Sequence, residues 1–296
     1  MRLLKQYILD TANAELARYV TNQFEPSGLS YKELLGTKNG FSTLLGKSTK
    51  WANDFGDYWV TGMYLAPHSE VHGLQLCWGR GACVRTCLGY TGHLGIRPAN
   101  HMKLDMHITE RRTRALFEHT EMFLTRLVSQ IMMMSSHRDN LMIRLNGTSD
   151  IRWEYILDLK KMSEDFGCKF FDYTKLPLSK RQPIEDVYRL CYSYDEKKVS
   201  WDRATEYIEA GYPIAIVLTK EDYKKVLSWT NEYIIDGDQH DIRYFDSGIC
   251  VLKYKRPSGK YAQAPNEQFI QSVQVVSNLA YKKLAYEHTK KYGVLV

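Results

Sequence analysis

Residues 201–218 read WDRATEYIEAGYPIAIVL, and this stretch contains the unit from which the fold is built. Its first part has the apolar spacing of an amphipathic helix, which Gly211 closes at the C-terminus. The apolar run 213–218 follows directly and has the composition of a strand that is buried on both faces. A helix joined by a short turn to such a strand predicts one repeat of a parallel α/β sheet.

The same alternation of strand and helix recurs from Gly62 to about Lys255. Apolar strands separated by amphipathic helices are typical of a mainly parallel sheet. Short polar runs follow the strand ends, as in a βα barrel, where these ends meet at one mouth. The sequence therefore predicts an α/β protein with a partial or full βα barrel, and a doubly wound sheet is the alternative. The other strands are expected at 62–67, 141–145, 169–174, 188–194 and 232–236, and the other helices near 109–135, 153–166 and 221–230.

Three segments are expected along the chain. Residues 1–61 form an N-terminal arm of helix and loop, residues 62–260 form the βα barrel with a cysteine loop at 77–87, and residues 261–296 form a C-terminal helix. No internal repeat and no linker rich in Pro, Gly or Ser divides the sequence further.

The composition is that of an ordinary globular protein. The 296 residues are 44% apolar and 25% charged, and 40 Lys and Arg against 34 Asp and Glu give a formal net charge of +6. This excess helps binding to a polyanion without requiring one. No apolar run approaches the ~20 residues that span a bilayer, and the first residues lack the apolar core of a signal peptide. We therefore expect a cytoplasmic protein with no membrane partner, and no pattern indicates its oligomeric state.

Three of the six cysteines lie close together, with the spacing Cys77-x5-Cys83-x3-Cys87. Thiolates are soft ligands that hold zinc or the irons of an iron–sulfur cluster. Structural zinc usually has four ligands, and His72 or His93 would complete the set. Three thiolates alone fit a 4Fe-4S cluster with one open iron. We therefore predict that these cysteines bind metal, with iron–sulfur favoured over zinc; the alternative is three unconnected apolar residues.

Two arginines and three further cysteines fit the same interpretation. Arg80 and Arg85 stand between the clustered thiols in the sequence and would offset the negative charge of a thiolate-bound cluster. Cys168, Cys191 and Cys250 lie at or within predicted strands, where a free cysteine packs as a small apolar residue.

Four stretches resemble the bacteriophage gene product 88 family in their order and spacing. The resemblance covers roughly residues 40–255 and implies a phage protein, although the family has no assigned activity. The stretches are YLAPHSEVHGLQLCWGRGACVRTCLGYTG at 64–92, ERRTRALF at 110–117, IRLNGTSDIRWE at 143–154 and IIDGDQHDIRYFD at 234–246.

The chain is also similar, more weakly, to radical S-adenosylmethionine enzymes, which have a partial βα barrel and a three-cysteine loop after the first strand. Their loop spacing is C-x3-C-x2-C, from which this chain departs. In those enzymes the turn after the second strand contacts the amino group of the methionine. The resemblance implies that role for Asn146, Gly147, Thr148, Ser149 and Asp150. The alternative is that Thr148, Ser149 or Asp150 caps the helix expected from position 153.

A group of carboxylates is expected at a later strand end, where Asp236, Asp238 and Asp241 stand close to His240 and Arg243. Neighbouring carboxylates repel one another unless a cation neutralises them, so such a group indicates a site for a cosubstrate or a substrate. The alternative is an Asp-Gly hairpin turn with solvated charges, in which Arg243 pairs with Asp238 or Asp241.

The stretch 80–126 carries more basic than acidic side chains, with Trp78 and Tyr90 close by. Such a stretch suits a nucleic-acid phosphate backbone, and an ordinary solvated helix face is the alternative. The basic residues are Arg80, Arg85, Arg97, Lys103, Arg111, Arg112, Arg114 and Arg126.

Together these patterns predict a phage-encoded iron–sulfur protein of the host cytoplasm, resembling a radical S-adenosylmethionine enzyme. It would use a small-molecule cosubstrate and modify a nucleotide or a nucleic acid. The alternative is a non-catalytic module, stabilised by zinc or iron–sulfur, that binds nucleic acid or a host protein. An enzyme with a zinc-activated water ranks last, because zinc bound only by thiolates is electron-rich and activates water poorly.

Overall fold

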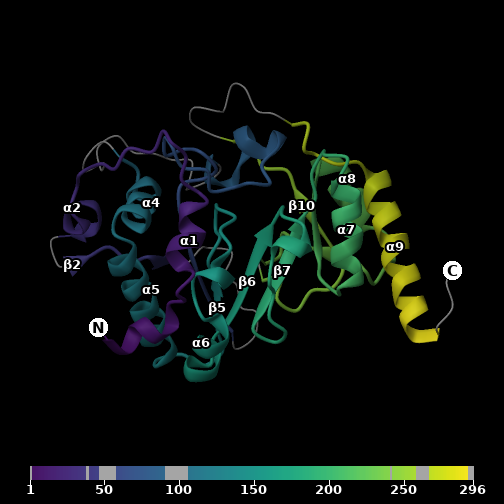
Figure 1. Ribbon diagram of the computed structural model, residues 1–296. Helices are drawn as coiled ribbons and strands as arrows, with labels where there is room; N and C mark the ends of the chain where they lie inside the picture. Colours follow the sequence, from purple (N-terminus) through teal and green to yellow (C-terminus); the bar gives the residue numbers. More distant parts are fainter. Residues whose placement is uncertain are drawn as a thin grey trace. The chain divides into compact units, whose positions relative to one another are not determined.

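A computed structural model of the chain describes residues 2–37, 40–46, 58–90, 106–240, 242–257 and 267–292. Within these ranges the chain alternates between strands and helices (Figure 1). The strands are β1 Gly36–Thr37, β2 Gly40–Phe41, β3 Leu45–Gly46, β4 Trp59–Met63, β5 Leu141–Arg144, β6 Lys169–Thr174, β7 Tyr188–Ser193, β8 Ile214–Leu218, β9 Ile234–Asp236 and β10 Ile249–Lys253. The α-helices are α1 Ala12–Ala17, α2 Tyr31–Leu35, α4 Ile108–Glu118, α5 Thr120–Ser135, α6 Leu159–Phe166, α7 Ser200–Glu209, α8 Lys220–Leu227 and α9 Val273–Tyr292. Short 3₁₀ helices span Arg2–Tyr7, Ala82–Thr86, Leu88–Tyr90, Trp153–Tyr155 and Leu178–Lys180.

Among the described residues, eight strands form one sheet in the order β3-β4-β5-β6-β7-β8-β10-β9. The pairs β4–β5, β5–β6, β7–β8, β8–β10 and β10–β9 are parallel, and β3 is antiparallel to β4. The predicted mainly parallel α/β sheet is confirmed. The predicted hairpin alternative for the carboxylate segment is wrong, because β9 and the next strand, β10, are parallel.

The single helix predicted over 109–135 is two helices in the structure, because the helix is interrupted at His119. The backbone of His119 leaves the helical region, with φ −137° and ψ 49°. Its ring Nε2 donates to the carbonyl of Leu29 at 2.7 Å, and the ring meets Tyr31 edge-on. A contact with a distant segment therefore overrides the helical periodicity of the sequence.

The chain divides into two compact units, each described by itself. The first unit comprises Met1–Trp78, Ile96–Phe170 and Pro183–Tyr188. In it α4 packs against α2 and α5, and α5 also packs against α6 and the opening 3₁₀ helix. Along the neighbouring strands, Val60, Met63 and all four residues of β5 are buried.

The second unit comprises Gly79–Gly95, Phe171–Gln182 and Arg189–Val296. Here α8 packs against β8, β9 and β10, and α7 packs against β8 and α9 (Figure 1). The rings of Tyr192 on β7 and Tyr207 on α7 stack 5.1 Å apart. Gly211 has φ +79° just after α7, which confirms the predicted glycine end of that helix.

None of the helices in the described ranges combines the length and the apolar character that crossing a lipid bilayer requires.

Candidate functional site

Two of the predicted site segments meet in the first unit. The thiol of Cys77 points to the carbonyl oxygen of Thr148, with 3.8 Å between Sγ and O. The main-chain N–H of Asp150 donates to the carbonyl of Leu76 at 2.9 Å, and the Gln75 amide donates to the carbonyl of Cys77 at 3.0 Å. The first cysteine of the motif is therefore held on the turn that follows β5.

Asn146 organises this turn with its own side chain, which is 1% exposed. Its Oδ1 accepts hydrogen bonds from Ser149 Oγ at 2.8 Å, from the Ile151 N–H at 2.9 Å and from Trp153 Nε1 at 3.3 Å. Its Nδ2 donates to the carbonyl of Ile151 at 2.8 Å. The amide oxygen of Asn146 is thus fully used within the protein, and the side chain shapes the turn.

The predicted capping role of this turn is wrong. The 3₁₀ helix Trp153–Tyr155 has Arg152 at its N-terminal boundary and no side-chain cap. The following helix, α6, is capped by Asp158, whose side chain accepts from the Lys161 N–H. The Ser149 hydroxyl donates to Asn146 and the Thr148 hydroxyl donates to the carbonyl of Leu65, so neither hydroxyl caps a helix.

Gly147 allows the turn to close over the end of β4. Its N–H donates to the carbonyl of Met63 at 2.9 Å. A Cβ atom at this position would lie 2.5 Å from that carbonyl oxygen and 2.6 Å from the ring of Tyr64, which is closer than van der Waals contact. Only glycine fits here without a shift of the backbone.

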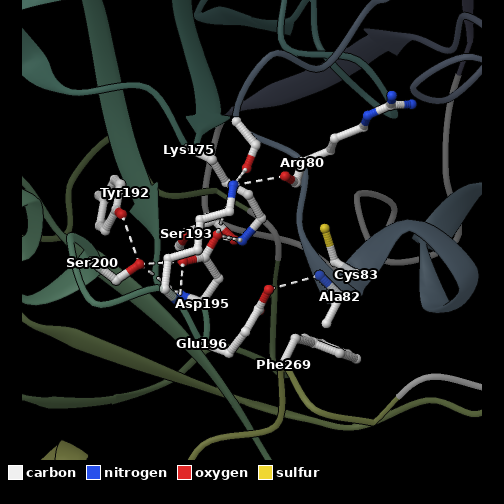
Figure 2. A network of polar contacts seen from close by, with 12 residues as sticks. Arg80, Ala82, Cys83, Lys175, Tyr192, Ser193, Asp195, Glu196, Ser200 and Phe269 are labelled. Carbon is white, nitrogen blue, oxygen red and sulfur yellow. Dashed lines mark hydrogen bonds and ion pairs between the residues drawn. The ribbon is translucent and has the colours of Figure 1, made fainter.

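Cys83 and Cys87 lie in the second unit. The loop after β7 holds the segment that leads to Cys83 (Figure 2). The Glu196 carboxylate accepts the main-chain N–H of Ala82 at 2.7 Å. The Lys197 ammonium donates to the carbonyls of Gly79 and Arg80 at 2.7 and 2.6 Å. Residues 195–197 therefore bind both the start of the cysteine segment and the residue that precedes Cys83.

Asp195 anchors this loop from within, with a side chain that is 1% exposed. Its Oδ1 accepts from the Ser200 hydroxyl and from the Lys197 N–H. Its Oδ2 lies 3.7 Å from Lys175 Nζ and 3.9 Å from Lys197 Nζ. Ser200 also lies 3.1 Å from the hydroxyl of Tyr192, and burial raises the pKa of that tyrosine. One buried carboxylate thus positions two lysines, and one of them, Lys197, donates hydrogen bonds to the cysteine segment.

The close approach of the two loops depends on Gly79. A Cβ atom there would collide with the side chain and main chain of Lys175, whose Nζ donates to the carbonyl of Ser193 at 3.0 Å. The sequence analysis did not identify Lys175, Asp195 or Lys197 as site residues. Asp195 and Lys197 stand in the polar run that follows the strand at 188–193, and Lys175 directly follows the strand at 169–174.

The cysteines separate into two groups by burial. Cys77, Cys83 and Cys87 are half-buried, whereas the other three are fully buried. Burial raises the pKa of Cys168 to about 12 and that of Cys191 well above its usual value. The predicted core packing is therefore confirmed for the latter three, Cys168, Cys191 and Cys250.

The described part of the chain contains no cluster of three or more His, Cys, Asp or Glu placed to hold a metal ion. Cys77 belongs to the first unit, and Cys83 and Cys87 belong to the second. The convergence of the three sulfurs on one metal therefore stays a prediction.

Two of the predicted carboxylates, Asp236 at the end of β9 and Asp238 after it, have protein partners. Asp236 accepts from the Tyr223 hydroxyl at 2.5 Å and from the Asp238 N–H at 2.9 Å. Asp238 lies 3.5 Å from the Lys255 ammonium. Arg243 pairs with Asp246 at 2.7 Å rather than with Asp238. The third predicted residue, Asp241, lies outside the described residues.

Comparison with known proteins gives one assignment. The family model described as gene product 88 matches residues 32–272. No curated protein and no solved structure matches the chain. The comparisons give no similarity to radical S-adenosylmethionine enzymes, so this second resemblance stays a prediction.

Proposed function

The chain belongs to the bacteriophage gene product 88 family, and from that premise we propose that it is a phage iron–sulfur protein. The thiols of Cys77, Cys83 and Cys87 would hold a 4Fe-4S cluster, with zinc as the alternative metal. The observation that carries the proposal is that these three cysteines are half-buried, whereas the other three are fully buried. A thiol that water reaches loses its proton more readily than a buried one, and the thiolate is the form that binds metal.

The surroundings of these cysteines fit a cluster. Cys77 is fixed on the turn after β5, and the segment of Cys83 is fixed by Glu196 and Lys197. A bound iron–sulfur cluster would supply electron-transfer chemistry. Glu196 and Lys197 would position the loop, and the cysteines would ligate the metal. Loops held in this way reduce the ordering cost of metal binding.

An enzyme similar to the radical S-adenosylmethionine class is the favoured form of this proposal. The strands β4 to β8 follow one another across the sheet in chain order, which is the succession of a partial βα barrel. The turn 146–150 and the loop 195–197 both follow the carboxyl ends of strands, where sites of such folds form. The expected cosubstrate is S-adenosylmethionine at the turn, and the expected substrate is a nucleotide or a nucleic acid.

The alternative is a non-catalytic module in which the metal stabilises the loop. The bonding of the Asn146 side chain favours it, because the amide oxygen already accepts three hydrogen bonds within the protein and is not available to a cosubstrate. Asp236 is likewise bonded to Tyr223 and to the Asp238 N–H. Under this alternative the surface of the module binds nucleic acid or a host protein.

The deciding experiment is anaerobic purification followed by measurement of colour, iron, sulfide and zinc. Iron and sulfide that are lost in Cys77→Ala, Cys83→Ala and Cys87→Ala, and kept in the control Cys168→Ala, support the cluster. Zinc that is lost in the same three variants and kept in Cys168→Ala supports the module. The absence of both metals overturns the proposal. Equilibrium binding of S-adenosylmethionine to the iron-loaded protein then separates the enzyme from the module.

A further inference from the structure

Two arginines of the first unit bind one short segment of chain and a third, Arg111, lies close enough to Arg112 for their charges to interact; we call the three the arginine cluster. Arg111 and Arg112 lie on α4, and Arg126 lies on α5. Arg112 donates to the carbonyl of Thr43 at 2.7 Å. Arg126 donates to the carbonyls of residues 41 and 42 at 3.1 and 3.3 Å. Three consecutive carbonyls therefore orient two of the guanidinium groups.

The carboxylates on the surrounding helices are bound elsewhere. On α4, Glu110 and Glu118 both lie 3.3 Å from Arg114. On α2, Glu33 accepts hydrogen bonds from the cap of its own helix. On α5, Glu121 pairs with a lysine of the opening 3₁₀ helix. In the part of the chain that the structure describes, the arginine cluster thus has no acidic partner.

The positive charge of the cluster is partly removed from water. The Nε atoms of Arg111, Arg112 and Arg126 are buried and have no hydrogen-bond partner in the described ranges. Burial lowers the pKa of Arg112 to about 10, with the charge of Arg111 adding to the effect, and burial also lowers the pKa of Arg111. Desolvated charges are costly until an opposite charge compensates them.

An exposed aromatic ring stands beside these charges. Phe41 is 37% exposed, and the Arg126 guanidinium lies 4.9 Å from the centroid of its ring. Guanidinium groups recognise the oxygens of a phosphate through paired hydrogen bonds. Aromatic rings next to basic side chains are the usual platform for the bases of single strands.

From these observations we propose that the arginine cluster binds a phosphate group of a nucleic acid or a nucleotide. The exposed ring of Phe41 makes single-stranded nucleic acid the favoured source of that phosphate. This site does not depend on a metal at the cysteines, so it can fail or hold separately from the proposed function.

The test is fluorescence anisotropy of the full-length protein with a labelled single-stranded DNA oligonucleotide at several salt concentrations. The variant Arg111→Gln/Arg112→Gln should weaken binding about tenfold and reduce the salt slope by roughly 1.4, because two phosphate contacts are lost. Arg114→Gln is the matched control on the same helix, since Arg114 has two carboxylate partners, and it should bind as the wild type does. Circular dichroism should show that the double variant still folds, because among the described residues it breaks no ion pair and only one hydrogen bond, the exposed one from Arg112 to the Thr43 carbonyl.

Inorganic phosphate and a nucleoside triphosphate form the second arm of the experiment. If the oligonucleotide does not bind, either ligand should raise the Tm of the wild type and leave that of the double variant unchanged. This result assigns the site to a free phosphate or a nucleotide. Two outcomes overturn the proposal. One is equal binding by the wild type and the double variant, and the other is binding of an acidic peptide with no response to any phosphate ligand.

Discussion

The thiol of Cys77 and the carbonyl of Thr148 lie 3.8 Å apart, which joins the loop of clustered cysteines to the turn after β5. The contact is reinforced by the main-chain bond between Asp150 and Leu76. A candidate metal ligand is therefore positioned by the carboxyl end of a buried strand, and a disturbance of the turn should be felt at the thiol.

Gly147→Ala tests that coupling. The added methyl group would press on the Met63 carbonyl and the Tyr64 ring, so we expect the free energy of unfolding to fall by about 1–3 kcal/mol. The displaced turn should also make the Cys77 thiol react faster with a thiol reagent. Urea denaturation and labelling kinetics give the two measurements. Gly46→Ala is the control, because a Cβ there meets nothing within 4 Å, and an equal effect of both variants would contradict the steric argument.

Lys197→Ala tests whether the loop after β7 holds the cysteine segment. The substitution removes the charged donor to the carbonyls of Gly79 and Arg80, and bonds of this type are worth roughly 1.5–3 kcal/mol. We expect faster amide hydrogen exchange across residues 79–90 and faster labelling of Cys83. Lys198→Ala is the matched control, since the neighbouring lysine is exposed. Unchanged exchange in Lys197→Ala would mean that the segment is held by other contacts.

The strands could be predicted from the sequence because their signal is local. The run KFFDYT predicts the bounds of β6, Lys169–Thr174, and PIAIVL predicts β8 to within one residue. The break at His119 could not be predicted, because it follows from a bond to Leu29, 90 residues away in sequence.

The candidate site shows the same division between local and distant signals. The cysteine motif and the polar turn after β5 are visible as compact patterns. The bond between Glu196 and the Ala82 N–H spans 114 residues, and nothing in either segment indicates the other. Main-chain partners of this kind leave no pattern in a single sequence, because every residue carries the same donor and acceptor.

Glu15→Gln tests a buried ion pair that ties α1 to the segment after the turn. Arg152 Nε donates to Glu15 at 2.8 Å, Tyr19 donates to the same carboxylate at 3.1 Å, and both charged residues are buried. Removal of the negative charge takes away the carboxylate that compensates the buried Arg152 charge in this pair, so we expect a loss of about 3–5 kcal/mol in the free energy of unfolding. The control is Lys5→Ala, which breaks an exposed pair and should cost less than about 1 kcal/mol. Chemical denaturation of both variants measures the difference, and similar costs would contradict the role of burial.

Tyr31→Phe should remove part of the alkaline loss of stability. The Tyr31 hydroxyl is buried without a hydrogen-bond partner in the described ranges, and burial raises its pKa to about 12, although the charge of Arg126 acts in the opposite direction. Between about pH 10 and 12 the unfolded chain loses this proton while the folded protein keeps it, so the free energy of unfolding falls as the pH rises through that window. Below pH 10 the contribution of Tyr31 is fully present.

A shift of two pKa units corresponds to roughly 2–3 kcal/mol. In urea denaturation between pH 9 and 12, the free energy of unfolding of Tyr31→Phe should therefore decline by that much less than the wild-type value. At neutral pH the variant should match the wild type, because its lost hydroxyl has no partner to leave unpaired. Tyr281→Phe, at a position that is 62% exposed, is the control and should keep the wild-type decline. An unchanged pH profile in Tyr31→Phe would show that the buried hydroxyl ionises as it does in the unfolded chain.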